Sequence, residues 1–335
     1  MPPDTLRPPS PLDPTASAYK DWFHLNFAEP DSGTIGLINA SLHGSPWDER
    51  ARAVGTVLVH SPRWGWKSHV EIKAYADANL AGSVIALTDT ALAIDGRSGT
   101  IHASMHGAGN PFSARLSAEP LTAPIDIEQP LPLGSGWISW YLVPSLRLSG
   151  EWATSEGHNV LRNAPAYHDH NWGRWHWGED FGWEWGCFLG APEDPHAATI
   201  VFGRTCDRAH RRFGTPFLTA DSRRARRRFA PECVTVKYGG YREAPLHRVP
   251  GAMAALHQEM AEPRLPGTVE IDAQQGDERM TVEFTARAAA QLVTADPEIR
   301  GYGFIHEIVG AYHAAGTMAG LAFETNGYGV FEYVM

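Results

Sequence analysis

The chain has 335 residues, and its 28 basic and 38 acidic residues give a formal net charge of −10 at pH 7. This acidic balance argues against general nucleic-acid binding, which needs a basic face, and no apolar run is long enough to predict a membrane-spanning helix. With 43% hydrophobic and 20% charged residues, the composition is typical of a globular protein with a sizeable core, built as two domains or one large β domain.

The first segment, residues 1–18, is rich in proline and lacks the apolar stretch of a secretion signal. We predict that it is a disordered lead. The three cysteines, Cys187, Cys206 and Cys233, form no C-x-x-C pair. An odd number of cysteines without a secretion signal favours free thiols in a reducing cytoplasm.

Alternating apolar and polar residues then predict strands along most of the chain. Glycine-containing links at 95–99 and 274–277 and the APEDPH segment predict hairpin turns. Only residues 252–262 have the pattern of a helix. The predicted strands cover 69–80, 83–95, 100–105, 137–144, 145–154, 183–190, 199–207, 267–273, 278–288 and much of the last 35 residues.

Many short strands at close spacing indicate a mainly β protein, an antiparallel sandwich or barrel with little helix. A barrel leaves no exposed edges and can hold a small ligand inside. All 12 tryptophans lie at or before Trp185, which suggests two β units with different roles. We place them at residues 19–205 and 206–335.

The boundary region is unusually basic, with nine arginines and no lysine from Arg204 to Arg228. The simpler interpretation is a solvated surface hairpin. The alternative is a contact for a partner or an anionic membrane surface, because arginines cluster where phosphates are bound.

The stretch AYHDHNWGRWHWGEDFGWEWGCFL, residues 166–189, concentrates five tryptophans, three histidines and four carboxylates. If residues 166–172 form a strand, Tyr167, Asp169 and Asn171 point to one face, and His168 and His170 point to the other. The two faces lead to different hypotheses.

A carboxyl in an apolar pocket loses hydration of its ionised form, so its pKa rises. If the first face lines an aromatic cavity, Asp169 could stay protonated at neutral pH and donate a proton to an electron-rich double bond. Nearby tryptophan rings would stabilise the resulting cation.

The second face carries an H-x-H pair, His168 and His170, which could bind zinc with His176 or a carboxylate as a third ligand. Trp172 shares this face and no clear ligand set completes a site, so we predict no metal.

A purely structural role is the third alternative for this stretch. Asp169 and Asn171 could anchor a chain reversal at Asn171–Gly173, with a second reversal at Gly178. Glu184 is a further candidate acid, although a pairing with Arg174 explains it equally well. His306 and Glu307 are adjacent, so only one of them can face the inside of a strand.

Y-H-D-H-N-W-G followed by W-E-W-G resembles the carotenoid 1,2-hydratase (hydroxyneurosporene synthase) and AttH-like lipocalin family. WFHLNFAEPDSG (22–33) and NGYGVFEYV (326–334) resemble the first and last strands of that family. The resemblance implies two lipocalin-like antiparallel β-barrels, a hydrophobic small-molecule ligand, and no metal or organic cofactor.

The tyrosine and aspartate of the family's Y-x-D motif match Tyr167 and Asp169, and the resemblance implies that Asp169 is the acid. The family's histidine-x-tryptophan before a proline corresponds here to Trp140-Tyr141-Leu142-Val143-Pro144. The histidine is absent, so the resemblance supports the fold and the acid more strongly than carotenoid hydration itself.

The sequence therefore predicts a cytoplasmic enzyme that converts an isoprenoid or polyene by hydration or cyclisation without a cofactor. The alternative is a lipocalin-like carrier without chemistry. Contact with a membrane through residues 204–228 is a further expectation. We expect Asp169 and Tyr167 to be catalytic, and the substrate to contact Trp140, Trp172, Trp185, Asn171, Glu184 and Glu307.

Overall fold

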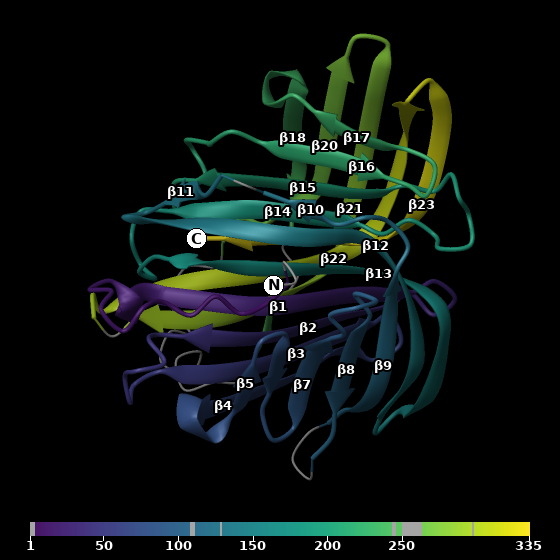
Figure 1. The fold of residues 1–335 in the computed structure, drawn as a ribbon. Helices are drawn as coiled ribbons and strands as arrows, with labels where there is room; N and C mark the ends of the chain where they lie inside the picture. The colour runs from purple at the N-terminus through teal and green to yellow at the C-terminus, as the bar shows by residue number, and fades with distance from the viewer. Residues whose placement is uncertain (1–3, 108–110, 128, 243–245, 250–262, 297) are drawn as a thin grey trace. The chain divides into compact units, whose positions relative to one another are not determined.

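The computed structural model describes residues 4–107, 111–127, 129–242, 246–249, 263–296 and 298–335 (Figure 1). Within these ranges the regular structure is β-strand, interrupted by three short 3₁₀ turns at Ala16–Ala18, Tyr75–Asp77 and Pro231–Cys233, and there is no α-helix. In the same ranges no helix is long and apolar enough to cross a membrane. The helix predicted over 252–262 lies outside the described residues.

The first sheet has 13 strands, and its main path runs β4-β3-β2-β1-β13-β12-β9-β8-β7-β6-β5, with β10 and β11 also paired to β12. Its strands are β1 (Tyr19–Glu29), β2 (Thr34–His43), β3 (Arg52–Ser61), β4 (Gly65–Ala74), β5 (Asn79–Ala81), β6 (Val84–Ala86), β7 (Thr90–Ile94), β8 (Ile101–Met105), β9 (Ser113–Pro120), β10 (Ile125–Asp126), β11 (Leu131–Leu133), β12 (Gly136–Thr154) and β13 (Gly157–Arg174).

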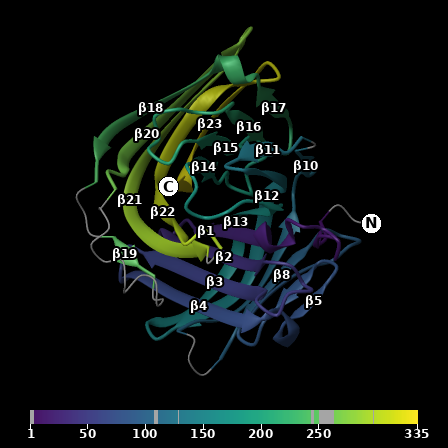
Figure 2. The same cartoon turned by 90° about the vertical axis from the view of Figure 1, so that its left-hand side faces the viewer.

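The second sheet has 10 strands in the order β17-β16-β15-β14-β23-β22-β21-β20-β18, and β19 runs parallel to β21. Figure 2 shows the strong bend of β20, β21 and β22. Its strands are β14 (Gly182–Phe188), β15 (Thr199–Cys206), β16 (Phe217–Asp221), β17 (Arg226–Phe229), β18 (Val234–Tyr241), β19 (His247–Arg248), β20 (Pro266–Gln275), β21 (Glu278–Asp296), β22 (Gly301–Met318) and β23 (Leu321–Val334).

Both sheets are curled and form half-barrels, which confirms the predicted mainly β fold of two lipocalin-like units. The first compact unit comprises residues 1–29, 36–59 and 67–176, and the second comprises 30–35, 60–66 and 177–335. The main change of unit therefore lies after residue 176, earlier than the predicted boundary after residue 205. The reason is that β14 and β15 pair with each other and β14 pairs with β23.

The predicted hairpins are present, because β7 pairs with β8, β14 with β15, and β20 with β21. Two predicted strands are each divided. The segment 69–80 forms the end of β4, a 3₁₀ turn and β5, and the segment 83–95 forms β6 and β7. Conversely, 137–144 and 145–154 form the single long strand β12, whose register shifts between Val143 and Leu146.

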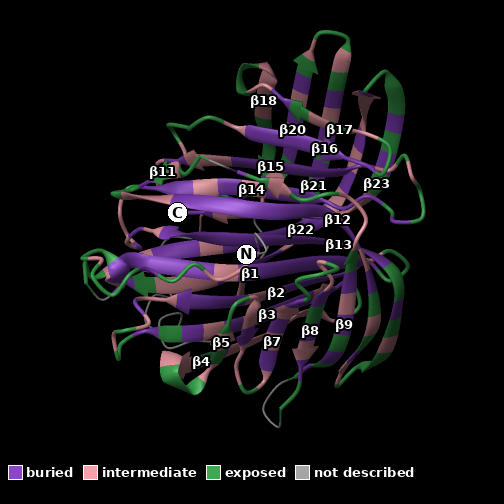
Figure 3. Ribbon diagram, in the orientation of Figure 1, coloured by how far each residue is buried: buried purple, intermediate pink, exposed green. Residues whose placement is uncertain are grey.

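The apolar core of the first sheet can be traced from the alternation of β9 and β12. Ala114 and Ala118 are buried and lie opposite Trp152 and Leu148, whereas Arg115, between the two alanines, is exposed. In β1 and the second half of β13, by contrast, almost every residue is buried (Figure 3). Both faces of this central pair are therefore covered.

The register carries the core face from β12 onto β13. Leu146, on the core face, lies opposite Ala166, and Val143 lies opposite His168. His168, His170 and Trp172 therefore point to the core face of the sheet, and Tyr167, Asp169 and Asn171 point to the opposite face.

The segment Asn171–Gly173 is not a chain reversal, because β13 continues to Arg174 and stays paired with β1. Gly173 is needed instead for close strand packing. A Cβ atom at this position would lie 2.2 Å from the backbone oxygen of Trp137 and 3.0 Å from Trp175.

Residues 4–18 differ from the predicted disordered lead. The backbone N–H of Leu6 donates to the oxygen of Gly82, and Ser83 Oγ donates to the oxygen of Asp4. Asp4 is 6% exposed. Composition alone suggested disorder, but this segment forms hydrogen bonds with the first sheet and buries a carboxylate there.

We predict that Gly173→Ala lowers the free energy of unfolding by about 1–3 kcal/mol, because the backbone of β12 cannot make room for a methyl group. Gly267→Ala is the matched control, since its nearest contact would be at 3.4 Å. Chemical denaturation of both variants measures the difference. Equal stability of the two variants would show that β12 and β13 approach less closely than described.

Candidate functional site

The motif Tyr167, Asp169 and Asn171 occupies one face of β13, at the centre of the first sheet. The register places His24 of β1 opposite Asp169, and Asn26 opposite Tyr167. On the other side, β12 places Trp140 opposite Asn171. We call this group the acid cluster; its members are His24, Asn26, Trp140, Tyr167, Asp169 and Asn171, and all six are buried.

Side chains of its own strand hold the Asp169 carboxyl. Tyr167 Oη donates to Oδ2 at 2.8 Å, and Asn171 Nδ2 donates to Oδ1. Asp169 is 6% exposed. Residues spaced by two along a strand share a face, which explains why Y-x-D-x-N forms this arrangement.

Burial raises the pKa of the Asp169 carboxyl above its ordinary value, although His24, Tyr167, His168 and Asn171 each lower it in part. Desolvation dominates because the ionised form loses its water. The site therefore favours a carboxylic acid at a pH where an exposed aspartate has lost its proton.

His24 and two asparagines form a hydrogen-bonded chain beside Asp169. His24 Nε2 lies 2.7 Å from Asn26 Oδ1, and Asn39 Nδ2 lies 3.4 Å from His24 Nδ1. One ring nitrogen donates and the other accepts, which is the pattern of a neutral imidazole. Burial also lowers the pKa of His24, so the positive charge that would most depress the pKa of Asp169 is disfavoured.

The opposite face of β13 carries a second group, the ionic cluster, formed by Asp4, Asp21, His168 and His170. His170 Nε2 lies 2.8 Å from Asp21 Oδ1, and its Nδ1 lies 3.3 Å from Asp4 Oδ1. His168 Nε2 lies 3.1 Å from Asp4 Oδ2, and its Nδ1 donates to the backbone oxygen of His24 at 2.8 Å.

Two carboxylates and two imidazoles thus lie in contact with one another away from water. The pKa of His170 is raised to about 9, since attraction to Asp21 and Asp4 outweighs the desolvation of the ring. The pKa of Asp4 is lowered by His168 and His170 in spite of its burial. The His168–His170 pair is therefore engaged by carboxylates, an arrangement that fits charge pairing better than a zinc site.

A separate group could hold a metal ion: the ligand atoms of His69, Glu71 and Asp89 lie within 4.8 Å of one another. Glu71, however, accepts the backbone N–H groups of Thr88 and Asp89 at 3.0 Å each, and Lys73 Nζ lies 3.7 Å from it. These contacts give the carboxylate a structural role at the β6–β7 turn.

The predicted substrate contacts are divided between different places. Asn171 and Trp140 share the face of Asp169. Trp172 lies on the core face, where the Arg7 guanidinium sits 3.9 Å from its ring centre. Trp172 therefore lies on the other face of β13 from Asp169, and its role as a substrate contact stays a prediction.

Glu184 belongs to the second unit, where it is the centre of an ion-pair network. Arg204 Nε donates to its Oε2 at 2.7 Å, Tyr238 Oη donates to the same oxygen, and His210 Nδ1 lies 2.9 Å from Oε1. These partners lower the pKa of Glu184 despite its burial, so it is poorly suited to be an acid. Arg174 pairs with Asp13, not with Glu184.

Trp185 and Glu307 also lie in the second unit. Both are opposite Glu332 of β23, on its two sides, so they share one face of the second sheet. His306 faces the other way, with Nδ1 2.9 Å from the oxygen of Tyr333 and Nε2 2.8 Å from Gln291. The role of Trp185 and Glu307 as substrate contacts stays a prediction.

Among the described residues, four of the nine arginines of 204–228 pair with carboxylates, including Arg204 with Glu184 and Arg226 with Asp221. Arg212 contacts Asp180 and Asp207, and Arg227 contacts Glu278. Three of them, Arg226 to Arg228, form most of the short edge strand β17. Charged side chains on an edge strand discourage pairing with another chain, so the structure gives these residues a role without a ligand.

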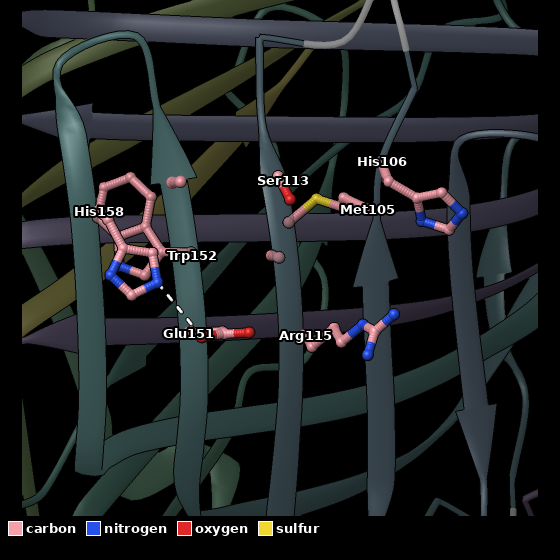
Figure 4. A pocket seen from close by; sticks show the side chains of 9 residues that line it. Met105, His106, Ser113, Arg115, Glu151, Trp152 and His158 are labelled. Atoms are coloured by element: carbon pink, nitrogen blue, oxygen red, sulfur yellow. Dashed lines mark hydrogen bonds and ion pairs between the residues drawn. The ribbon is translucent and has the colours of Figure 1, made fainter.

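The first unit also contains a cavity of about 240 Å³, lined by Met105, His106, Ser113, Ala114, Arg115, Glu151, Trp152, Ala153 and His158 (Figure 4). His158 Nε2 lies 3.3 Å from Glu151 Oε2 of the neighbouring strand, and both side chains are more than half exposed. Asp169 does not line this cavity.

Sequence reasoning missed four residues of the two clusters: Asp4, Asp21, His24 and Asn26. The alternation H-x-N in WFHLNFAE could have placed His24 and Asn26 on one face, matching Y-x-D-x-N. Nothing local could have revealed Asp4, whose partner His168 is 164 residues away in the chain.

No family model and no curated protein matches the chain. Solved structures do match. The structure of a putative AttH from Nitrosomonas europaea matches with a TM-score of 0.67 and 14% identity, covering 98% of this chain and 98% of that one. Kievitone hydratase from Nectria haematococca matches with a TM-score of 0.62 and 10% identity, covering 95% of this chain and 89% of that one.

CghA in a structure with Sch210972 matches with a TM-score of 0.58 and 12% identity, covering 95% of this chain and 88% of that one. At these identities the similarity shows the fold. The chain has a lipocalin-like β fold shared over nearly its whole length with these proteins.

We predict that the ionic cluster makes stability depend on pH. Because the pKa of His170 is raised from 6.5 to about 9, its contribution is complete below pH 6.5 and is lost as the pH rises through about 9. The loss should be on the order of 3 kcal/mol.

Denaturation between pH 6 and pH 10 tests this prediction. His170→Gln should flatten the decline, whereas His158→Gln, an exposed histidine on the same strand, should leave it unchanged. A decline of the same size in His170→Gln would mean that another group causes it.

Proposed function

We propose that the protein converts a hydrophobic alkene, an isoprenoid or polyene, by acid catalysis with Asp169 as the proton donor. The observation that carries the proposal is the state of this carboxyl: it is buried, held from two sides by Tyr167 and Asn171, and its pKa is raised. A catalytic acid needs its pKa near the working pH, and burial provides that shift.

In the proposed reaction the Asp169 O–H bond breaks and the proton adds to one carbon of a C=C bond. The other carbon becomes a carbocation and Asp169 becomes a carboxylate. Tyr167 and Asn171 already donate to its two oxygens. They stabilise the carboxylate at the moment when it forms, so the proton transfer becomes easier.

The carbocation then reacts in one of two ways. Water can add and return a proton to the Asp169 carboxylate, which completes a hydration. Alternatively, an internal alkene or hydroxyl can add and close a ring, and the cation so formed then loses a proton to the Asp169 carboxylate, which restores the acid. The name of kievitone hydratase, a protein of the same fold, supports the first outcome. Neither path requires a metal or an organic cofactor.

Trp140 is the tryptophan best placed to shield the cation, because it lies opposite Asn171 on the face of the acid. The face of an indole ring attracts a cation, and the effect grows when water is excluded. Trp140 is 7% exposed. Trp22 of β1 also lies opposite Asn171 and extends the aromatic surface.

A carrier without chemistry is the second candidate. It is favoured by one observation: both carboxyl oxygens of Asp169 have donors within the protein, an arrangement that also suits a structural carboxylate. The enzyme and the carrier differ in the expected effect of removing the Asp169 proton: the enzyme should lose turnover, and the carrier should keep its ligand binding.

We predict that Asp169→Asn keeps the fold and loses at least about 10²-fold in turnover, because asparagine matches the shape of the acid but cannot deliver its proton. Tyr167→Phe should lose less, since it removes one hydrogen bond. Turnover of candidate alkenes, with thermal unfolding of each variant, is the measurement.

Normal turnover by Asp169→Asn would remove Asp169 from the chemistry. Two results together would favour the carrier. The wild-type protein would turn over no alkene, and Asp169→Asn would bind the ligand as tightly as the wild type does.

A further inference from the structure

Asn26 holds a buried polar atom that the proposed chemistry does not use. The residue is 0% exposed and lies on the face of Asp169. Its Oδ1 is bonded to His24, but among the described residues its Nδ2 has no hydrogen-bond partner. A buried donor without a partner costs free energy comparable to a lost hydrogen bond, so few proteins retain one without a reason.

The neighbouring side chains fix which end of the amide is free. Asn39 Nδ2 can only donate, so the His24 Nδ1 that it contacts accepts. His24 Nε2 must then carry the ring proton and donate to Asn26, which turns Oδ1 toward the ring. The chain Asn39–His24–Asn26 therefore leaves an N–H donor unoccupied, not an acceptor.

The position of this donor relates it to the acid. Asn26 lies opposite Tyr167, one pair along from the His24–Asp169 pair. Diagonal neighbours of this kind on one face of a sheet are roughly 7–8 Å apart. A single small molecule can thus contact Asn26 and Asp169 at the same time.

We infer that Asn26 determines substrate specificity by donating a hydrogen bond to an oxygen of the substrate, which is therefore an oxygenated alkene carrying a hydroxyl, ether or carbonyl group and not a pure hydrocarbon. This inference rests on the proposed function, because it places the ligand at Asp169. A hydrocarbon would leave the amide buried without a partner, and sites of this type reject ligands that lack the matching polar group.

A pair of probes tests the inference directly. Farnesyl methyl ether offers only an acceptor, and farnesene is the corresponding hydrocarbon. Quenching of tryptophan fluorescence gives the dissociation constant of each. The wild-type protein should bind the ether roughly tenfold more tightly, the usual effect of one buried hydrogen bond.

Two variants remove the donor in different ways. Asn26→Leu eliminates the amide. Asn26→Asp replaces Nδ2 by oxygen but keeps an acceptor for His24. The second variant therefore tests the inference even where Asn26→Leu does not fold. Both should bind the two probes with a ratio near one. Asn159→Leu, on the far end of β13, is the control and should keep the tenfold preference.

Equal affinity of the wild-type protein for both probes, or failure of both to bind, would overturn the inference, as would a preference that survives in both Asn26 variants. Asp169→Asn separates this result from the proposed chemistry, because binding requires no proton transfer. It should keep the preference for the ether even though it loses turnover. If the wild-type protein prefers the ether but Asp169→Asn remains fully active, the acid mechanism is contradicted and the inference about Asn26 is not.

Discussion

The central constraint in the first unit is that β13 is buried on both faces while its side chains alternate between them. Consecutive residues of H-D-H therefore enter two separate environments. His168 and His170 meet Asp4 and Asp21 on the core face, and Asp169 meets hydroxyl and amide groups on the other. In a shared environment, the two histidines and Asp169 would pair with one another. Here the strand separates an ion-paired cluster from a carboxyl whose closest partners are neutral.

That separation is what makes Asp169 suited to proton transfer. A buried carboxyl next to a fixed cation keeps its ionised form, because attraction offsets desolvation. His170, whose pKa is raised, is held on the core face by Asp21 and Asp4, and His24, on the face of the acid, has its pKa lowered by burial. The ionic cluster thus serves the site indirectly, since it fixes β1 and β13 in register and retains the positive charge elsewhere.

The second sheet contains a comparable device. Its first strand, β14, carries Glu184, as β1 carries Asp21, and each carboxylate is followed by a tryptophan. Asp21 accepts hydrogen bonds from Tyr19, His170 and the backbone of Arg7, and Glu184 accepts from Tyr238, Arg204 and His210. In both sheets a buried carboxylate accepts hydrogen bonds from a tyrosine hydroxyl and contacts nitrogen atoms of basic side chains. In β14 it accounts for a residue that the sequence had suggested as an acid.

The sequence allowed the mainly β fold and the Y-x-D motif to be predicted, because alternation and turns are local signals. It could not show which face of β13 meets the core, since both faces are buried and the register passes through an irregularity between Val143 and Leu146. The burial of Asp4 depends on contacts far along the chain, and proline-rich composition gave the opposite expectation. His24 and Asn26 were overlooked because each is unremarkable until β1 pairs with β13.

The central claim is that Asp169 carries its proton under conditions where an ordinary aspartate does not. Infrared difference spectroscopy between the wild-type protein and Asp169→Asn isolates the signal of this one carboxyl. In a pH titration, the account predicts a band of the protonated acid that is absent from the variant and persists to higher pH than the usual aspartate pKa of about 4 allows. A protonated band that disappears over the range of an ordinary aspartate would contradict it.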